Sequence, residues 1–332
     1  MGKPTSIIVT KAERKMETLR DFFETYTIDQ TESLDKKNFG SVYKAIDKET
    51  KAVWAAKISE IHPNFDKGIF KERYEQAKAL EHPNLMPYST NYRFTEGMIT
   101  TIALMPLLPS GNLNDQLNLD RADKKLVADQ VLDGLYYLHA QELVWQNLSA
   151  RHILLEKEFG NEIPVFINYG NKTKIPLAFF SDYEYLAPEQ FDDKASINAQ
   201  TDIWAYGVLL YKLWTGRLPF GEKSASLPNA KIQARITGEE DWTLGLLDEI
   251  PQPYQKIVEK CLKKEKEARW ANCGEIIAVI KNWVPPVQTT AVWEEEAEIE
   301  TRRYLRKPNK PIIWWQVLLL FIIAGLLGYY LG

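Results

Sequence analysis

The chain has 332 residues, of which 45% are hydrophobic and 26% are charged, and its formal net charge at pH 7 is −4. This balance is that of an ordinary globular protein and argues against disorder over most of the length. The length suits one two-lobed domain with extensions, and the slightly negative charge excludes a general attraction to nucleic acid.

The first predicted element is a helix within residues 11–26, where apolar side chains recur at helical spacing and should pack on the segment that follows. These apolar residues are Leu19, Phe22, Phe23 and Tyr26. Two β-rich runs come next, at 41–47 and 52–58, and the polar residues between them predict a hairpin turn.

A charged helical stretch at 67–81 separates these runs from further β-like sequence at 98–108. After Gly111 the pattern becomes mostly helical, as far as Trp283. Strands therefore come first, with one helix among them, and helices follow. This order predicts an α+β fold with a β-rich N-terminal lobe and a helical C-terminal lobe.

The chain divides into four predicted segments. An N-terminal helical extension covers residues 1–27 and precedes a two-lobed domain at 28–284. A charged connector, acidic first and then basic, follows at 285–310, and a transmembrane helix is predicted at 311–332.

The last segment, residues 311–332, contains no charged side chain. The 20 residues from Ile312 to Leu331 would span about 30 Å as a helix, the thickness of a hydrocarbon core. Aromatic residues at both ends match the interfacial belts, and the basic residues before the segment predict that its N-terminal side is cytoplasmic. The sequence thus predicts a single-pass tail anchor, with a buried core helix as the alternative. Ala324 and Gly328 are small residues four apart, which either allow helix pairing or face lipid.

Eight short motifs occur in a fixed order between Gln30 and Trp283. They lie at 39–45 (FGSVYKA), 55–57 (AAK), 82–85 (HPNL), 105–113 (MPLLPSGNL), 134–139 (GLYYLH), 187–189 (APE), 202–208 (DIWAYGV) and 261–270, where CL is followed by RW. In this order and at this spacing they resemble a protein kinase domain of the eukaryotic type, over roughly three quarters of the chain. The resemblance implies the bilobal kinase fold.

The resemblance also identifies the position of the catalytic base. A kinase positions phosphates and neutralises their charge, and an aspartate accepts the proton of the substrate hydroxyl. Here the corresponding triplet is Trp145, Gln146 and Asn147, and an amide cannot act as that base. The lysine and asparagine that follow in the family correspond to Ser149 and His152.

The metal-binding motif reads Asn-Tyr-Gly, starting at Asn168, where the family has Asp-Phe-Gly. Asn168 offers one neutral oxygen, which is a poor ligand for Mg²⁺. The three glycines of the loop that covers the phosphates correspond to Asp35, Lys37 and Gly40, so one of the three is retained. The resemblance therefore implies that this chain has no metal site and no catalysis.

Lys57 corresponds to the lysine that contacts phosphates in kinases. The position of its partner glutamate is occupied by Arg73, which is flanked by Glu72 and Glu75. Two interpretations remain open. Lys57 either contacts a nucleotide without a metal or forms a structural ion pair with one of the two carboxylates, and we favour the ion pair.

Residues that hold the family's fold together are retained. Glu189 and Arg269 resemble an ion pair of the C-lobe, and Asp202 resembles the aspartate that holds the backbone of the catalytic loop. Trp145 and Tyr169 replace a histidine and a phenylalanine with larger aromatic side chains that still fill space. Retention of the fold's residues together with loss of the chemical ones indicates a pseudokinase.

We therefore expect an inactive kinase homologue that acts as a scaffold or signalling module for protein partners on the cytoplasmic face of a membrane. We expect it to bind no metal, and the sequence identifies no cofactor with certainty. One alternative is a switch that senses a nucleotide, binding ATP without Mg²⁺, and another is a divergent, active Ser/Thr kinase. Ser181, Tyr183 and Tyr185 are either phosphorylation sites or, in the favoured interpretation, packing residues. Cys261 and Cys273 are expected to be buried or inert.

Overall fold

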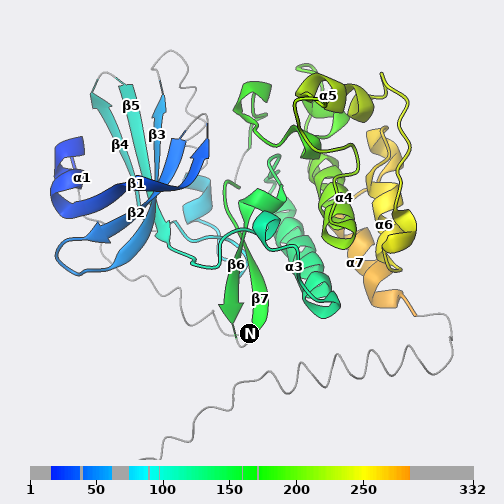
Figure 1. The fold of residues 1–332 in the computed structure, drawn as a ribbon, viewed down its shortest axis with the longest axis horizontal. Helices are drawn as coiled ribbons and strands as arrows, with labels where there is room; N and C mark the ends of the chain where they lie inside the picture. The colour runs from blue at the N-terminus through cyan, green and yellow to red at the C-terminus, as the bar shows by residue number, and fades with distance from the viewer. Residues whose placement is uncertain are drawn as a thin grey trace, which may run out of the picture. The chain divides into compact units, whose positions relative to one another are not determined.

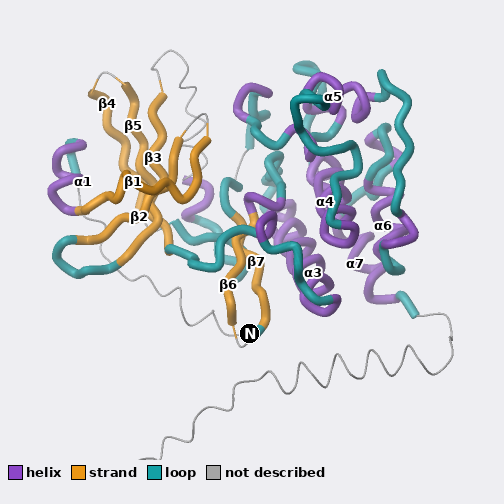
Figure 2. The backbone as a smooth tube through the Cα atoms, viewed as in Figure 1, coloured by secondary structure: helices purple, strands orange, loops and turns teal. Residues whose placement is uncertain are grey.

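The architecture comes from a computed structural model of the chain. It describes residues 16–37, 40–61, 75–88, 90–96, 98–158, 160–169 and 172–284. The described strand-rich part and helical part belong to one compact unit (Figure 2).

The N-terminal part of this unit is a five-stranded antiparallel sheet with the strand order β1-β2-β3-β5-β4 (Figure 1). Its strands are β1 (Tyr26–Lys37), β2 (Gly40–Asp47), β3 (Val53–Ile61), β4 (Thr90–Glu96) and β5 (Met98–Pro106). Lys57 lies within β3, the central strand, opposite Val42 of β2 and Ala103 of β5. Pairing on both sides fixes the register of β3 and hence the face on which Lys57 lies.

Helix α1 (Leu19–Thr25) packs on this sheet through Phe22, which is fully buried. The helix begins at a capping box, in which Asp21 N–H donates to Thr18 Oγ1 at 3.1 Å and Thr18 N–H donates to Asp21 Oδ2 at 2.9 Å. The described helix is shorter than the one predicted at 11–26. Tyr26 already belongs to β1, and its ring lies 4.9 Å from that of Phe22.

The C-terminal part is mainly helical, so the predicted α+β, two-lobed architecture is confirmed. Its helices are α3 (Arg121–Ala140), α4 (Ala199–Thr215), α5 (Asn229–Thr237), α6 (Tyr254–Cys261) and α7 (Cys273–Asn282). Short 3-10 turns lie at Leu113–Asp115, Ala150–His152, Leu177–Phe179, Tyr183–Tyr185, Pro188–Gln190, Leu247–Glu249 and Lys266–Ala268.

A small two-stranded sheet of β6 (Ile153–Glu158) and β7 (Asn161–Phe166) interrupts the helical part. The sequence pattern does not predict it, because short apolar runs do not distinguish a strand from a piece of buried helix. β7 ends beside the segment that precedes β4: Phe166 N–H donates to Asn84 O at 2.7 Å, and Met86 N–H donates to Phe166 O at 3.0 Å. These bonds join the strand-rich part to the helical part.

Helix α4 runs through the centre of the helical part. It begins at Asn198, whose Oδ1 accepts the N–H of Gln200 at 3.0 Å, and it ends at Gly216, which has a left-handed φ of 73°. Every residue from Thr201 to Leu213 is buried. Because α4 is buried on all sides, it places the carboxylate of Asp202 in its first turn inside the core.

The membrane prediction falls outside this description. Among the residues that the structure describes between 16 and 284, no helix is both long enough and apolar enough to cross a membrane. The predicted connector at 285–310 and the predicted transmembrane helix at 311–332 lie outside the described residues.

Candidate nucleotide and catalytic site

The side chain of Lys57 reaches across to the metal-binding motif of the C-lobe. Its Nζ donates a hydrogen bond to Oδ1 of Asn168, so the lysine contacts a neutral amide where a kinase has a carboxylate. Arg73 and Glu72 lie outside the described residues, and Glu75 is exposed. The favoured ion pair of Lys57 with a neighbouring carboxylate therefore stays a prediction.

The backbone of Asn168 has an unusual conformation and makes a hydrogen bond of its own. Its φ is 61°, a left-handed conformation that asparagine tolerates better than most residues, and its N–H donates to the hydroxyl of Tyr88 at 3.2 Å. The next residue, Tyr169, is fully buried and its hydroxyl donates to Met86 O at 2.6 Å. The first two residues of the metal-binding motif are therefore held by the hydroxyl of Tyr88, the carbonyl of Met86 and the ammonium group of Lys57.

The loop that carries the base position is held by Asp202. The carboxylate accepts the backbone N–H of Trp145 and of Gln146, each at 2.7 Å, and Nε2 of His139 lies 2.9 Å from it. Asp202 is fully buried, so these hydrogen bonds to a charged group are strong. Trp145 is also fully buried, and its ring stacks on that of Phe166 at 4.6 Å. The loop thus keeps the backbone support of a kinase.

Asn147, Ser149 and His152 occupy the three chemical positions of this loop, and the side chain of His152 contacts the other two residues. Nδ1 of His152 lies 2.7 Å from the carbonyl of Asn147 and 3.2 Å from Oγ of Ser149. A carbonyl only accepts, so Nδ1 carries the proton and donates it to Asn147 O. Within the described residues, no group of three or more histidine, cysteine, aspartate or glutamate side chains could hold a metal ion.

A carboxylate that the motifs do not predict lies beside this loop. Ser149 Oγ donates to Oδ2 of Asp182 at 3.0 Å, and Nε of Arg151 lies 3.4 Å from its Oδ1. Asp182 is distant from both residues along the chain. No local sequence signal announces the contact, because the fold alone brings the two segments together.

A cysteine, a histidine and an aspartate lie in line behind the catalytic loop. Sγ of Cys273 is 3.4 Å from Nδ1 of His139, which contacts Asp202 through its other nitrogen. The arrangement resembles a nucleophile with its base, but Cys273 is 1% exposed, and burial raises the pKa of its thiol far above the usual value. Cys261 is also buried, and both cysteines are free thiols. These contacts are structural.

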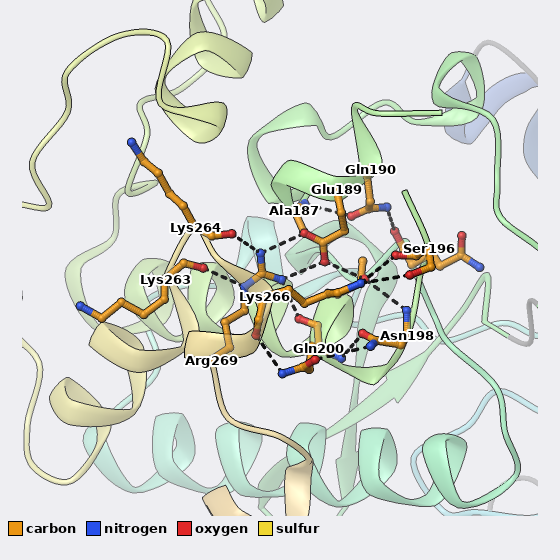
Figure 3. Close-up of polar contacts among 12 residues, drawn as sticks. Ala187, Glu189, Gln190, Ser196, Asn198, Gln200, Lys263, Lys264, Lys266 and Arg269 are labelled. Atoms are coloured by element: carbon orange, nitrogen blue, oxygen red, sulfur yellow. Dashed lines mark hydrogen bonds and ion pairs between the residues drawn. The ribbon is translucent and has the colours of Figure 1, made fainter. Parts of the chain in front are cut away.

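Arg269 and Glu189 form a buried ion pair at the end of the activation segment (Figure 3). The guanidinium donates to Glu189 Oε1 at 2.8 Å and to Oε2 at 2.9 Å. Its remaining N–H groups donate to the carbonyls of Lys263, Lys264 and Gln200 at 2.8–3.0 Å. All five donors of the side chain are therefore used.

The carboxylate of this pair is equally well supported. Oε1 of Glu189 also accepts the hydroxyl of Thr201 at 2.8 Å. Burial raises the pKa of Glu189, but the hydrogen bonds and the charge of Arg269 lower it by more, so its pKa lies below the usual value. The pair ties the activation segment to the start of α4 and to the segment before α7.

The three candidate phosphorylation sites differ in their surroundings. Ser181 is exposed, whereas Tyr183 is half-buried and its ring lies 5.9 Å from that of Phe191. Tyr185 is buried, and burial raises the pKa of its phenol far above the usual value. Among the three, Ser181 is the exposed one, and its hydroxyl donates to Oδ2 of Asp182 at 3.3 Å.

Comparison with known proteins matches the residues that build this site. Residues 29–280 match the family model described as "Protein kinase domain". Myosin light chain kinase 3 from Rattus norvegicus is 27% identical over 256 residues, which cover 74% of this chain and 31% of that protein. Smooth muscle myosin light chain kinase from Gallus gallus is 23% identical over 264 residues, which cover 76% of this chain and 13% of that protein.

A third relative comes from a different group of organisms. The serine/threonine-protein kinase pakE from Dictyostelium discoideum is 30% identical over 236 residues, which cover 65% of this chain and 24% of that protein. Each match covers less than a third of the relative's own length. The family model spans most of the present sequence, and the fold has the two lobes that the family requires. The chain therefore belongs to the protein kinase domain family.

Proposed function

We propose that this protein is a pseudokinase that acts as a scaffold or signalling module on the cytoplasmic face of a membrane. The observation that carries the proposal is the hydrogen bond between Lys57 and Asn168. It joins the lysine that would hold the phosphates to a neutral amide at the position of the metal-binding carboxylate. A site built in this way lacks the charge that holds Mg²⁺ against a nucleotide.

The same reasoning applies to the catalytic loop. Asn147 cannot accept a proton from a substrate hydroxyl, and loss of the base alone costs about 10²–10⁴-fold in rate. His152 stands at the second metal-binding position, and its Nδ1 donates to the carbonyl of Asn147. Loss of metal clamping adds several kcal/mol of unstabilised charge. The combined losses favour a protein-binding role over phosphoryl transfer.

The membrane part of the proposal rests on the sequence of residues 311–332. A stretch of 20 uncharged residues that follows a basic cluster is long enough to anchor the domain, and Ala324 and Gly328 offer a surface for a partner helix. An anchored, inactive domain meets its protein partners at the surfaces of its two lobes.

Fractionation of cells that express the full chain tests the anchor. The protein is expected in the membrane pellet after carbonate extraction. A variant with Leu320→Arg and Ile322→Arg is expected in the supernatant, because each arginine at the middle of a membrane helix costs about 2.5–3.5 kcal/mol.

The matched control introduces Val53→Arg and Met98→Arg, which replace two exposed apolar residues of the N-lobe. This variant should stay in the pellet with the unchanged protein. If the variant with two arginines in the predicted anchor also stays in the pellet, the chain is not anchored by residues 311–332.

A second candidate function is a nucleotide-sensing switch that works without metal. Asn168 accepts from Lys57 through Oδ1, which leaves its amide N–H groups as donors on the other side of the side chain. An amide does not repel a phosphate as a carboxylate does. ATP would therefore need no metal to offset repulsion at this position.

Thermal unfolding with ATP, with and without Mg²⁺, separates these functions. The scaffold predicts no shift of the unfolding midpoint at millimolar ATP. If ATP binds, a concentration of 100 times its Kd would add about 2.7 kcal/mol to the free energy of unfolding and raise the midpoint clearly. A shift without Mg²⁺ that disappears in Lys57→Ala would favour the switch, and a shift that requires Mg²⁺ would favour an active kinase. Lys44→Ala, on the neighbouring strand and exposed, is the matched control.

A further inference from the structure

We infer that residues 172–191, the described part of the activation segment, are held in place by Gln146, Lys174 and Asp182, so that the order of this segment does not depend on phosphorylation. The inference rests on hydrogen bonds of the segment and not on the proposed loss of catalysis. It remains valid whether or not the protein transfers phosphate.

Gln146 makes the central contact. Its Nε2 donates to Thr173 O at 2.8 Å, and its Oε1 accepts the N–H of Ile175 at 2.9 Å. The amide thus pairs with the backbone of the segment as a neighbouring strand would. Gln146 is 4% exposed, and its own N–H is fixed by Asp202. The support is therefore rigid.

The backbone of Gln146 fastens the far end of the segment. Its carbonyl accepts Nε2 of Gln190 at 2.9 Å, and Oε1 of Gln190 accepts the N–H of Ala187 at 3.0 Å. Both ends of the segment are consequently tied to one residue of the catalytic loop.

Lys174 supplies the second support. Its ammonium group donates to three backbone carbonyls, those of Glu189, Asp192 and Ala195, the first and last at 3.2 Å. All three donors of the ammonium group are used within the chain. A positive charge near the start of the segment therefore stabilises the carbonyls at its end.

Asp182 supplies the third support. Its carboxylate accepts the hydroxyl of Ser149 at 3.0 Å and lies 3.4 Å from Nε of Arg151, so a fixed negative charge already meets the catalytic loop. The apolar side chains between these supports pack together. Ile175, Phe180 and Leu186 form a separate buried cluster.

Within the described residues, the arginine position of the catalytic loop offers phosphorylation no comparable contact. Kinase activation segments become ordered when a phosphate pairs with arginine. The arginine position of the His-Arg-Asp motif is occupied here by Gln146, which is neutral and has both amide atoms engaged. A phosphate on the exposed Ser181 would stand beside Asp182 and compete with it for Arg151. It would exchange one anionic partner of Arg151 for another, so it would add no order to the segment.

Hydrogen exchange of the full chain in detergent, treated with phosphatase and checked by mass, tests the inference. Peptides from 172–180 are expected to exchange slowly without phosphate, and within about twofold of the rate in a Ser181→Glu variant. Gln146→Ala is expected to speed their exchange at least tenfold, because two hydrogen bonds are lost. Gln141→Ala, at an exposed glutamine, should change nothing.

Gln146→Met keeps the test decisive if the alanine variant fails to fold. It removes both hydrogen bonds of the amide but keeps most of the side-chain volume, so exchange of 172–180 should again rise at least tenfold, with peptides from 199–215 unchanged. The inference is overturned if 172–180 exchange at the rate of an unprotected chain before phosphorylation. It is equally overturned if a phosphate slows their exchange more than tenfold or if neither Gln146 variant changes it.

Discussion

Replacing Arg269 with alanine is expected to lower the free energy of unfolding by about 3–5 kcal/mol, because the change leaves the charge of Glu189 buried without its partner. It also removes hydrogen bonds from the carbonyls of Lys263 and Lys264. Denaturation by urea measures the loss. The midpoint of the transition should fall, while the m-value, the slope of the unfolding free energy against urea concentration, stays constant.

Arg269→Lys is expected to recover only part of this stability. Lysine keeps the charge, but its ammonium group cannot reproduce the two parallel hydrogen bonds to Glu189 and the three bonds to carbonyls. Arg20→Ala is the matched control, because Arg20 forms an ion pair with Glu24 on the exposed surface, and its replacement should leave the midpoint unchanged. A loss below about 1 kcal/mol for Arg269→Ala would place the pair with ordinary surface pairs and contradict its structural role.

The sequence predicts the architecture well because its signals there are local. The alternation of residues predicts β2, β3 and β5, and the order of motifs predicts which lobe each segment joins. Phe22 is fully buried, as its place in the helical pattern predicts, and the capping box at Thr18 sets the start of α1. Tyr26 shows the limit, since the same apolar spacing also suits the first residue of a strand.

The candidate site could be predicted only in part, because its contacts join distant segments. The identities of Asn147 and Asn168 follow from the motifs, but the partner of Lys57 lies 111 residues away. A residue that replaces a motif residue forms hydrogen bonds with different partners, and the sequence does not identify those partners. Gln146 is an example, since its side-chain amide contacts backbone 27 and 29 residues further on.

Asp182 is a charged residue whose contacts could not be predicted from the sequence either. It replaces nothing that the motifs define, yet it contacts Ser149 across 33 residues of sequence. Local patterns carry no trace of such a pair, because only the folded chain brings a turn of the activation segment against the catalytic loop. The motifs therefore reveal which family residues are replaced, and the structure reveals which contacts hold the site together.

Transfer of labelled phosphate from ATP tests the proposed loss of catalysis most directly. The assay uses the full chain, freed of contaminating kinases, with Mg²⁺ and both a protein substrate and the chain itself as acceptors. Lys57→Ala serves as the background and Lys44→Ala as the matched control. We predict no transfer above the background in the unchanged protein, because the base and both metal-binding residues of the family are replaced, and the missing base alone reduces the rate by about 10²–10⁴-fold. Transfer that requires Mg²⁺, persists in Lys44→Ala and disappears in Lys57→Ala would contradict the account and identify an active kinase.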